Sequence, residues 1–327
     1  MRVFRDASGI HLRDMPKSVV ALGTFDGVHL GHREILKRCI FRSRQENVPS
    51  VVFTFHRHPL ETIRPQFTPQ LLTDIEDKLA LIQGTGIENT VIAQFDHEMA
   101  RATPEEFVRE VLVDSLRAKW VIVGFNYTFG WKAQGNAETL KDLGEKYGFH
   151  VEVSKPVSVG GAVVSSTRIR SSLAKGDVES ASQMLGRPFS IKGKVIKGER
   201  RGKTLGYPTV NLDVFHGISL PQCGVYAATV YVKGHMFGAV TNIGTRPTFS
   251  GETMSVETHI IGYEGDLYGE TLRVLFAKKL RDEVKFSSGE ALACQISRDV
   301  ERAEEVLDRW NPCDTGFGIL EDASQGA

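Results

Sequence analysis

Residues 18–32 read SVVALGTFDGVHLGH, an apolar run that ends in a glycine-rich turn. The run Val19–Leu22 is uncharged and rich in valine, which is typical of a strand covered on both faces of a parallel sheet. The turn holds Gly23, Gly27 and Gly31 and leads directly into a predicted helix. In open α/β sheets, ligands bind beyond the carboxyl ends of such strands. We therefore expect a binding site in this turn.

Two histidines, His29 and His32, stand at the start of the predicted helix. A helix N-terminus offers unpaired N–H groups and the positive end of the helix dipole to a phosphate. Each imidazole can donate a hydrogen bond to phosphate oxygens whose charge grows during transfer, and preorganised donors of this kind contribute a few kcal/mol each. The turn therefore predicts a phosphate-transfer site rather than a pair of surface histidines.

The first half of the chain alternates strand-like and helix-like patterns. This alternation predicts an α/β doubly wound parallel sheet of Rossmann-like type. Capping boxes predict two of the helix starts, at Thr73 with Glu76 and at Thr103 with Glu106. Besides Val19–Leu22, strands are predicted at Val51–Phe55, Val91–Phe95, Trp120–Gly124 and Val151–Val153.

The pattern changes after Gly186 and Pro188, which together are typical of a helix end. Glycine- and proline-rich turns then separate strand-like runs with no helix pattern between them, which predicts an antiparallel barrel or sandwich. A long C-terminal helix follows, and its start is predicted as a capping box of Ser287 with Glu290. The strand-like runs are Ile191–Ile196, Val225–Val232, Met236–Asn242, Ser255–Ile261 and Thr271–Leu280.

Length and composition limit the class of protein. A chain of 327 residues fits two domains, which we place at residues 1–186 and 187–310, with a flexible tail at 311–327. The 40 basic and 40 acidic side chains balance, so no bulk charge favours nucleic acid or an anionic membrane as a partner.

The four cysteines lie far apart, which argues against a disulfide framework or a zinc site and for a reducing compartment. The N-terminal residues are charged and unlike a signal peptide, and no apolar run approaches the roughly 18 residues of a membrane span. We therefore expect a cytoplasmic protein with small-molecule partners. The sequence leaves open whether the chain forms a homo-oligomer.

The turn also carries a family resemblance. Residues 23–32 resemble the H-x-G-H signature of the nucleotidyltransferases, and their longer form G-x-F-D-G-V-H-x-G-H resembles the bacterial bifunctional riboflavin kinase/FAD synthetases. The resemblance implies that His29 and His32 are catalytic and that this segment binds ATP. The ATP-binding residues implied here are Gly23, Thr24, Phe25, Asp26, Gly27, His29, Gly31 and His32.

Three further segments of the first half extend the resemblance. Residues 54–59 read TFHRHP and are similar to the family's T-F-x-P-H-P, although Arg57 replaces a proline; this implies a flavin contact at His58. A metal at His56 and His58 is disfavoured, because no third ligand is apparent. Residues 123–130 read VGFNYTFG and imply a second flavin contact at Asn126.

The last of the three segments, residues 165–170, reads SSTRIR and is similar to the triphosphate clamp of the superfamily. The resemblance implies that Ser165, Ser166 and Thr167 bind ATP and that Arg170, rather than Arg168, is the catalytic arginine.

The second half contains a segment that invites a P-loop interpretation. Residues 198–204 read GERRGKT, but the spacing between the glycines is one residue short and no helix follows, which argues against a P-loop. The basic side chains there, Lys197, Arg200, Arg201 and Lys203, are either a flap over ATP phosphates or a solvated hairpin tip.

Residues 202–211, GKTLGYPTVN, resemble the riboflavin kinase signature G-R-x-L-G-(F/Y)-P-T-A-N. The resemblance implies that Thr209 and Asn211 bind the Mg²⁺ that carries ATP, and that Glu257 takes the proton from the 5′-hydroxyl of riboflavin. The ATP-binding residues implied for the kinase are Gly198, Gly202, Lys203, Gly206, Pro208, Thr209 and Asn211.

The resemblance therefore implies two ATP-dependent reactions in one chain. Riboflavin is phosphorylated to FMN in the barrel, and FMN is adenylylated by a second ATP to FAD and pyrophosphate in the α/β domain. Three alternatives are open at this point: an enzyme with one degenerate site, a nucleotidyltransferase for another phosphorylated acceptor, and a flavin sensor without activity.

Overall fold

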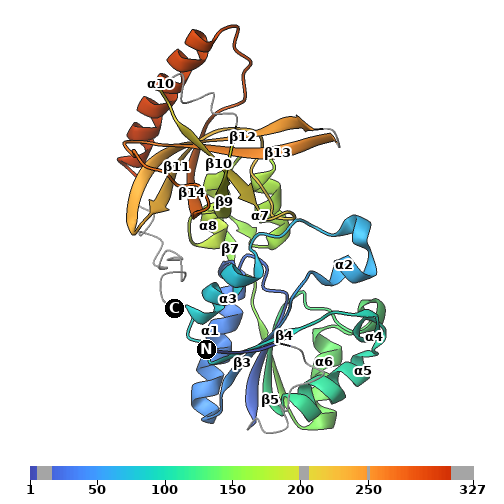
Figure 1. Ribbon diagram of the computed structural model, residues 1–327. Coiled ribbons are helices and arrows are strands. Elements are labelled where there is room, and N and C mark those ends of the chain that lie inside the picture. Colours follow the sequence, from blue (N-terminus) through green and yellow to red (C-terminus); the bar gives the residue numbers. More distant parts are fainter. Residues whose placement is uncertain (6–16, 199–205, 249–250, 311–327) are drawn as a thin grey trace. The chain divides into compact units, whose positions relative to one another are not determined.

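The computed structural model describes residues 1–5, 17–198, 206–248 and 251–310, which form two compact units (Figure 1). The first unit comprises the described residues up to Ser165, and the second those from Ser166 onward. The predicted tail at 311–327 lies outside the described residues. Each unit is built on a sheet of its own.

The first unit is built on a six-stranded parallel sheet in the order β1-β4-β3-β2-β5-β6. The chain passes from β2 to β3 and β4 on one side, and then crosses to β5 on the other side of β2. The topological switch point, where such sheets bind ligands, therefore lies between β2 and β5. The strands are β1 (Arg2–Arg5), β2 (Ser18–Leu22), β3 (Ser50–Phe55), β4 (Asn89–Ala93), β5 (Ala118–Gly124) and β6 (His150–Ser154).

The doubly wound sheet predicted from the sequence is confirmed, and the five strands predicted for it are present with small shifts at their ends. The edge strand β1 was not predicted. Its four residues, Arg2–Arg5, begin and end on arginine and pair with β4 alone, so they carry little of the apolar signal of a buried strand.

Helices precede or follow each strand of the sheet after β1. One predicted capping box is confirmed, because Thr103 Oγ1 accepts the N–H of Glu106 and the Glu106 carboxylate accepts the N–H of Thr103. The elements are α1 (Leu30–Glu46), α2 (Pro59–Ile63), η2 (Pro65–Phe67), α3 (Ile75–Gln83), α4 (His97–Arg101), α5 (Pro104–Phe107), a π-helical continuation η3 (Val108–Ser115), η4 (Trp131–Ala133), α6 (Ala137–Tyr147), and a small hairpin of β7 (Ser158–Val159) and β8 (Ala162–Val163).

The other predicted capping box, at Thr73, is wrong by one residue. Asp74 caps α3 by accepting the N–H of Asp77 at 2.7 Å, since its carboxylate is the stronger acceptor at a helix start. Thr73 Oγ1 accepts the N–H of Gly27 at 3.3 Å instead. Thr73 thus ties the start of α3 to the turn after β2.

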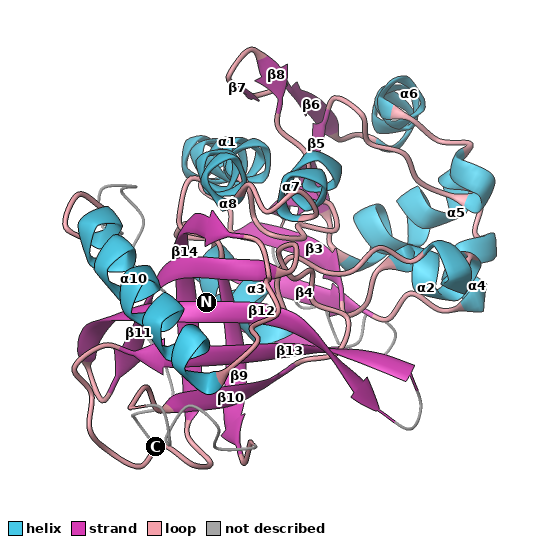
Figure 2. Cartoon of the chain, turned by 90° about the horizontal axis from the view of Figure 1, so that it is seen from above, coloured by secondary structure: helices cyan, strands magenta, loops and turns pink. Residues whose placement is uncertain are grey.

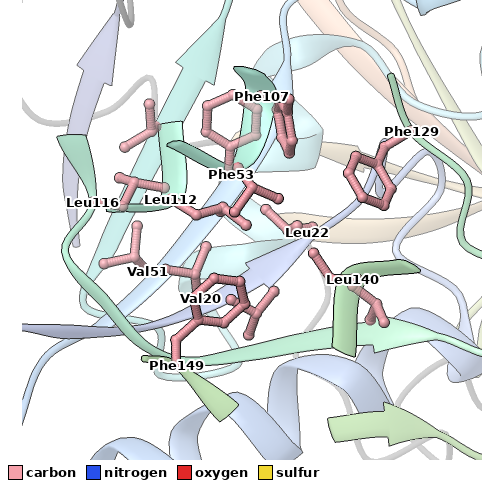
Figure 3. Close-up of a cluster of buried hydrophobic side chains, with 14 of the residues drawn as sticks. Val20, Leu22, Val51, Phe53, Phe107, Leu112, Leu116, Phe129, Leu140 and Phe149 are labelled. Atoms are coloured by element: carbon pink, nitrogen blue, oxygen red, sulfur yellow. The ribbon is translucent and has the colours of Figure 1, made fainter. Parts of the chain in front are cut away.

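Both faces of the sheet are covered. One face packs against α5, η3 and α6, in a cluster where Phe53, Phe107 and Leu112 are almost fully buried (Figure 3). On the other face α1 packs on β2, β3 and β5, with Leu36 and Cys39 fully buried. Coverage on both faces explains why the strands read as continuous apolar runs.

The second unit is a closed antiparallel barrel in the order β10-β13-β12-β11-β14-β9. Of the two architectures open from the sequence, the barrel is therefore correct. β10 was not predicted, because Asn211 and Asp213 interrupt its apolar pattern. The strands are β9 (Ser190–Ile196), β10 (Thr209–Val214), β11 (Gly224–Val232), β12 (His235–Thr248), β13 (Gly251–Ile260) and β14 (Thr271–Arg281).

Two helices precede the barrel, α7 (Ser166–Leu173) and α8 (Val178–Leu185). They pack on each other, α8 packs on β14, and the carbonyl of Leu173 accepts the N–H of Gln222 at 2.8 Å. By its contacts this helix pair groups with the barrel. The domain limits at residues 1–186 and 187–310 stay a prediction from the change in sequence pattern.

The C-terminal helix α10 (Gly289–Leu307) lies across β11 and β12 (Figure 2). Its cap is Ser288, which accepts the N–H of Ala291, so the cap predicted at Ser287 is wrong by one residue. Either serine is a residue type that caps a helix well. Like the other helices of the described ranges, α10 is not long and apolar enough to cross a membrane.

A buried ion pair fastens α10 to the barrel. Asp299 is 1% exposed and its carboxylate accepts from Arg281 on β14, with Oδ2 2.8 Å from Nη2. Gln295 Nε2 donates to the same carboxylate at 2.9 Å. Bidentate geometry and a third donor satisfy the buried charge.

We expect Asp299→Asn to lower the free energy of unfolding of the barrel unit by roughly 1.5–3 kcal/mol, because the charged hydrogen bonds to Arg281 are weakened at constant side-chain size. Urea unfolding followed by the fluorescence of Trp310, which packs beside α10, measures this. Glu301→Gln, on the exposed side of the same helix, is the control. Equal unfolding midpoints for both variants would show that the pair contributes nothing.

Candidate active sites

The turn between β2 and α1 lies at the switch point of the parallel sheet, and its backbone is strained. Phe25 (φ 49°) and Val28 (φ 38°) adopt the left-handed region although neither is glycine, and both are fully buried. Gly27 between them has φ 78°. Such strain costs about 1–3 kcal/mol per residue and persists only where packing imposes it.

Two hydrogen bonds hold this turn against its neighbours. The carboxylate of Asp26, 4% exposed, accepts the N–H of Leu72 at 2.9 Å, and the N–H of Gly27 donates to Thr73. The residues just before α3 therefore support the turn that sequence analysis predicted to bind ATP.

His29 is the N-cap of α1, and its Nδ1 accepts the N–H of His32 at 3.2 Å. In a neutral imidazole whose Nδ1 accepts, the proton lies on Nε2. The imidazole rings of His29 and His32 stack with 3.6 Å between centroids and 14° between planes. A Cβ at Gly31 would lie 3.2 Å from His29 Cε1, so glycine leaves room for this arrangement.

His32 remains neutral at physiological pH. Burial lowers its pKa well below the usual value, and the charges of His29 and Lys78 lower it further. Its Nδ1 is buried and has no hydrogen-bond partner in the described part of the chain. His32 thus offers a neutral imidazole, which suits hydrogen-bond donation to a phosphate without a fixed positive charge.

Lys78 on α3 is a residue of this site that sequence analysis missed. Lys78 is 8% exposed, and its ammonium donates to the carbonyls of Thr24 at 3.3 Å and Phe55 at 2.9 Å, at the carboxyl ends of β2 and β3. The sequence did carry a signal for this residue, because Lys78 is a charged residue on the buried face of α3, together with Leu81 and Ile82.

The predicted flavin-binding residues lie on loops of the first unit. Asn126 is exposed after β5, and a Cβ at Gly124 would lie 3.4 Å from both Asn126 Oδ1 and Ile35 Cδ1 of α1. Asn126 is therefore beside the helix that carries the histidines. His58 caps α2, and its Nδ1 accepts the N–H of Leu60 at 3.2 Å.

The predicted triphosphate clamp is divided between the two units. Ser165 is the last residue of the first unit, whereas Ser166, Thr167 and Arg170 stand on α7 in the second. Arg170 is half-buried, and Thr167 is exposed. The histidines and Arg170 therefore belong to different compact units.

In the barrel, strand pairing brings the predicted metal residues next to the predicted base. Asn211 on β10 pairs with Glu257 on β13, and Thr209 pairs with His259. Since side chains alternate along a strand, these four side chains share one face of the barrel. It is the outer face, because the intervening Thr258 is fully buried and bonds Thr241 at 3.0 Å inside.

The segment leading into β10 is held against the same face. The carbonyl of Pro208 lies 2.8 Å from His259 Nδ1, and the ring of Tyr207 contacts His259 edge-on at 5.5 Å. Gly206 has φ 81°, which only glycine adopts easily. Gly198 packs directly on the Asn211 side chain. The predicted residues Gly202 and Lys203, with Arg200 and Arg201, lie outside the described residues.

A second carboxylate near this face was missed as a site residue. Glu283 lies over Gly244, where a Cβ would contact its carboxylate, and the same position is 3.3 Å from Asn242 Nδ2. Asn242 pairs with Glu257 across β12 and β13. No local spacing signals this approach, because Glu283 follows β14, and β14 lies near β12 only through the strand β11 that pairs with both.

Comparison with known proteins matches each unit to a family. The FAD synthetase model matches residues 12–168, and the riboflavin kinase model matches residues 185–307. The bifunctional riboflavin kinase/FMN adenylyltransferase of Escherichia coli K12 is 36% identical over 308 residues, which cover 93% of this chain and 98% of that protein. The chain belongs to this bifunctional family.

Other relatives agree with this membership. The Bacillus subtilis protein of the same name is 34% identical and covers 89% of this chain and 92% of its own length. A crystal structure described as a macrolide-efflux protein from Streptococcus pneumoniae is 32% identical, with a TM-score of 0.83 over 95% of this chain and all of that one. The family resemblance and the two-domain fold class expected from the sequence are confirmed.

Proposed function

We propose that this chain makes FMN and FAD in two ATP-dependent steps, as its family membership indicates. The observation that supports it best is that each unit brings together side chains of the kinds that suit phosphate transfer. In the first unit the His29–His32 pair lies at the N-terminus of α1, and in the barrel Asn211 is paired with Glu257.

In the kinase step, we propose that Glu257 accepts the proton of the riboflavin 5′-hydroxyl, whose oxygen attacks the γ-phosphorus of ATP as ADP leaves. A positioned general base contributes on the order of 10²–10⁴-fold. Thr209 and Asn211 would hold Mg²⁺, since hydroxyl and amide oxygens beside a carboxylate match the hard ligands of that ion. When bound, Mg²⁺ would offset charge on the ATP phosphates.

In the adenylylation step, we propose that a phosphate oxygen of FMN attacks the α-phosphorus of a second ATP, and pyrophosphate leaves. His29 and His32 would donate hydrogen bonds to the phosphates. The clamp of Ser165, Ser166, Thr167 and Arg170 would bind the triphosphate, and Asn126 and His58 would contact the flavin. No covalent enzyme intermediate is needed, because positioning and charge stabilisation carry phosphoryl chemistry.

Gly198→Ala tests the proposed kinase site by changing the space that the Asn211 side chain occupies. The added methyl group would collide with the Asn211 side chain, which must then turn away from its place beside Glu257. We expect FMN formation to fall roughly 10-fold or more, with a raised KM for Mg-ATP and unchanged FMN adenylylation, since small misplacements are costly in group transfer. Gly234→Ala, at an open hairpin turn, is a control for glycine loss in the barrel.

Incubation of the purified chain with riboflavin, ATP and Mg²⁺, followed by separation of FMN from FAD, tests the whole proposal. Both products should form, with FMN appearing first. FMN alone would indicate a degenerate adenylyltransferase site, and FAD from added FMN alone would indicate a degenerate kinase. We further propose that both steps take place in the cytoplasm, with riboflavin, FMN and ATP as the partners.

A further inference from the structure

Lys78 is a buried cation without an ion-pair partner in the part of the chain that the structure describes. Burial of an unpaired ammonium is costly, so a lysine is a poor choice for a merely structural position on an apolar helix stripe. Two of its three N–H groups donate to the carbonyls of Thr24 and Phe55. A positive charge at this buried position therefore needs a functional explanation.

The carbonyls that Lys78 binds end the two strands next to the histidine turn. Thr24 opens the strained segment that leads to His29, and its carbonyl also accepts from Thr54 Oγ1 at 3.0 Å. Phe55 is the last residue of β3. One ammonium thus joins the carboxyl ends of β2 and β3 at the edge of the sheet where ligands bind.

We propose that Lys78 is a positioning residue of the adenylyltransferase site: its ammonium fixes the turn that presents His29 and His32, and it keeps a positive charge next to the phosphates. The inference rests on the proposed adenylylation of FMN. A charged donor is suited to this role, because charge-assisted hydrogen bonds are about twice as strong as neutral ones.

The titratable groups around Lys78 determine how this role depends on pH. Asp26 faces it from the turn and His32 from α1, and Asp77 precedes it on α3. From β3 it meets the Phe55 carbonyl. Burial lowers the pKa of Lys78 to about 8, against the opposing effect of Asp26. As pH rises through this value the ammonium loses its proton, so adenylylation should decline, whereas His32 titrates far below.

The test is the pH dependence of kcat/KM for ATP with FMN as acceptor, with riboflavin phosphorylation measured in the same samples. The unsubstituted chain should show an alkaline decline near pH 8 in adenylylation. Lys78→Met should lower adenylylation roughly 10²-fold and remove the decline. Lys78→Arg should restore part of the rate and remain active at alkaline pH, because guanidinium keeps its proton.

Thr54→Val is the matched control, since it removes the neutral hydrogen bond to the same Thr24 carbonyl and should leave the alkaline decline in place. A full adenylylation rate in Lys78→Met, or the same alkaline decline in Lys78→Arg as in the unsubstituted chain, would overturn the role of Lys78. If Lys78→Met fails to fold by circular dichroism, the comparison with Lys78→Arg decides. Absence of FAD from the unsubstituted chain would instead reject the proposed function on which this role rests.

Discussion

Glu257→Gln should abolish formation of FMN from riboflavin while added FMN is still converted to FAD. Glutamine keeps the size of the side chain on β13 and its place opposite Asn211, but it cannot accept the proton of the 5′-hydroxyl. Loss of a general base lowers the rate by about 10²–10⁴-fold. Rates of FMN appearance from riboflavin and of FAD appearance from FMN, measured on one preparation, give the result.

Glu264→Gln is the control for this substitution, because Glu264 is an exposed carboxylate in the loop after β13. It should leave both rates unchanged. Loss of both activities in a Glu257→Gln protein that is still folded would contradict two independent sites. Retention of kinase activity would move the role of base to another carboxylate, and Glu283, which lies over Gly244 on β12, is one candidate.

His29→Ala should have the opposite effect, with loss of FAD formation from FMN and normal phosphorylation of riboflavin. The substitution removes the proposed donor to the transferring phosphates, and such donors are worth about 10²–10³-fold each. It also removes the N-cap of α1, which costs about 1 kcal/mol of stability. These two effects must be separated before the loss of rate is interpreted.

His29→Ser separates them, because serine is a good N-cap but is too short to replace an imidazole. We expect His29→Ser to retain more of the thermal stability of the first unit and to be as inactive as His29→Ala in adenylylation. Recovery of FAD synthesis in His29→Ser would show that the histidine acts only as a cap. In each variant, the activity of the other site is measured as well, and it shows whether the protein is folded.

Much of the fold could be predicted because its signals are local. A few adjacent residues are enough to predict the strand Val19–Leu22 and the capping box at Thr103, and both are confirmed. Predictions were wrong where two neighbouring residues could each cap a helix, as at Thr73 and Asp74: the aspartate caps α3, and Thr73 bonds Gly27 instead. β10 was missed because polar side chains such as Asn211 interrupt the apolar pattern of the strand.

The residues of the candidate sites likewise fall into those that local sequence predicts and those that only the tertiary structure brings in. The sequence by itself determined the histidine turn and the Pro208–Asn211 segment, since the spacing of glycines, histidines and hydroxyls within a single turn is a property of the local chain. Only the tertiary structure decided which distant groups meet them: Glu257 opposite Asn211 through barrel register, and Lys78 beneath Thr24 through packing of α3. Convergence of this kind depends on how separate elements pack, and no spacing along the chain encodes it.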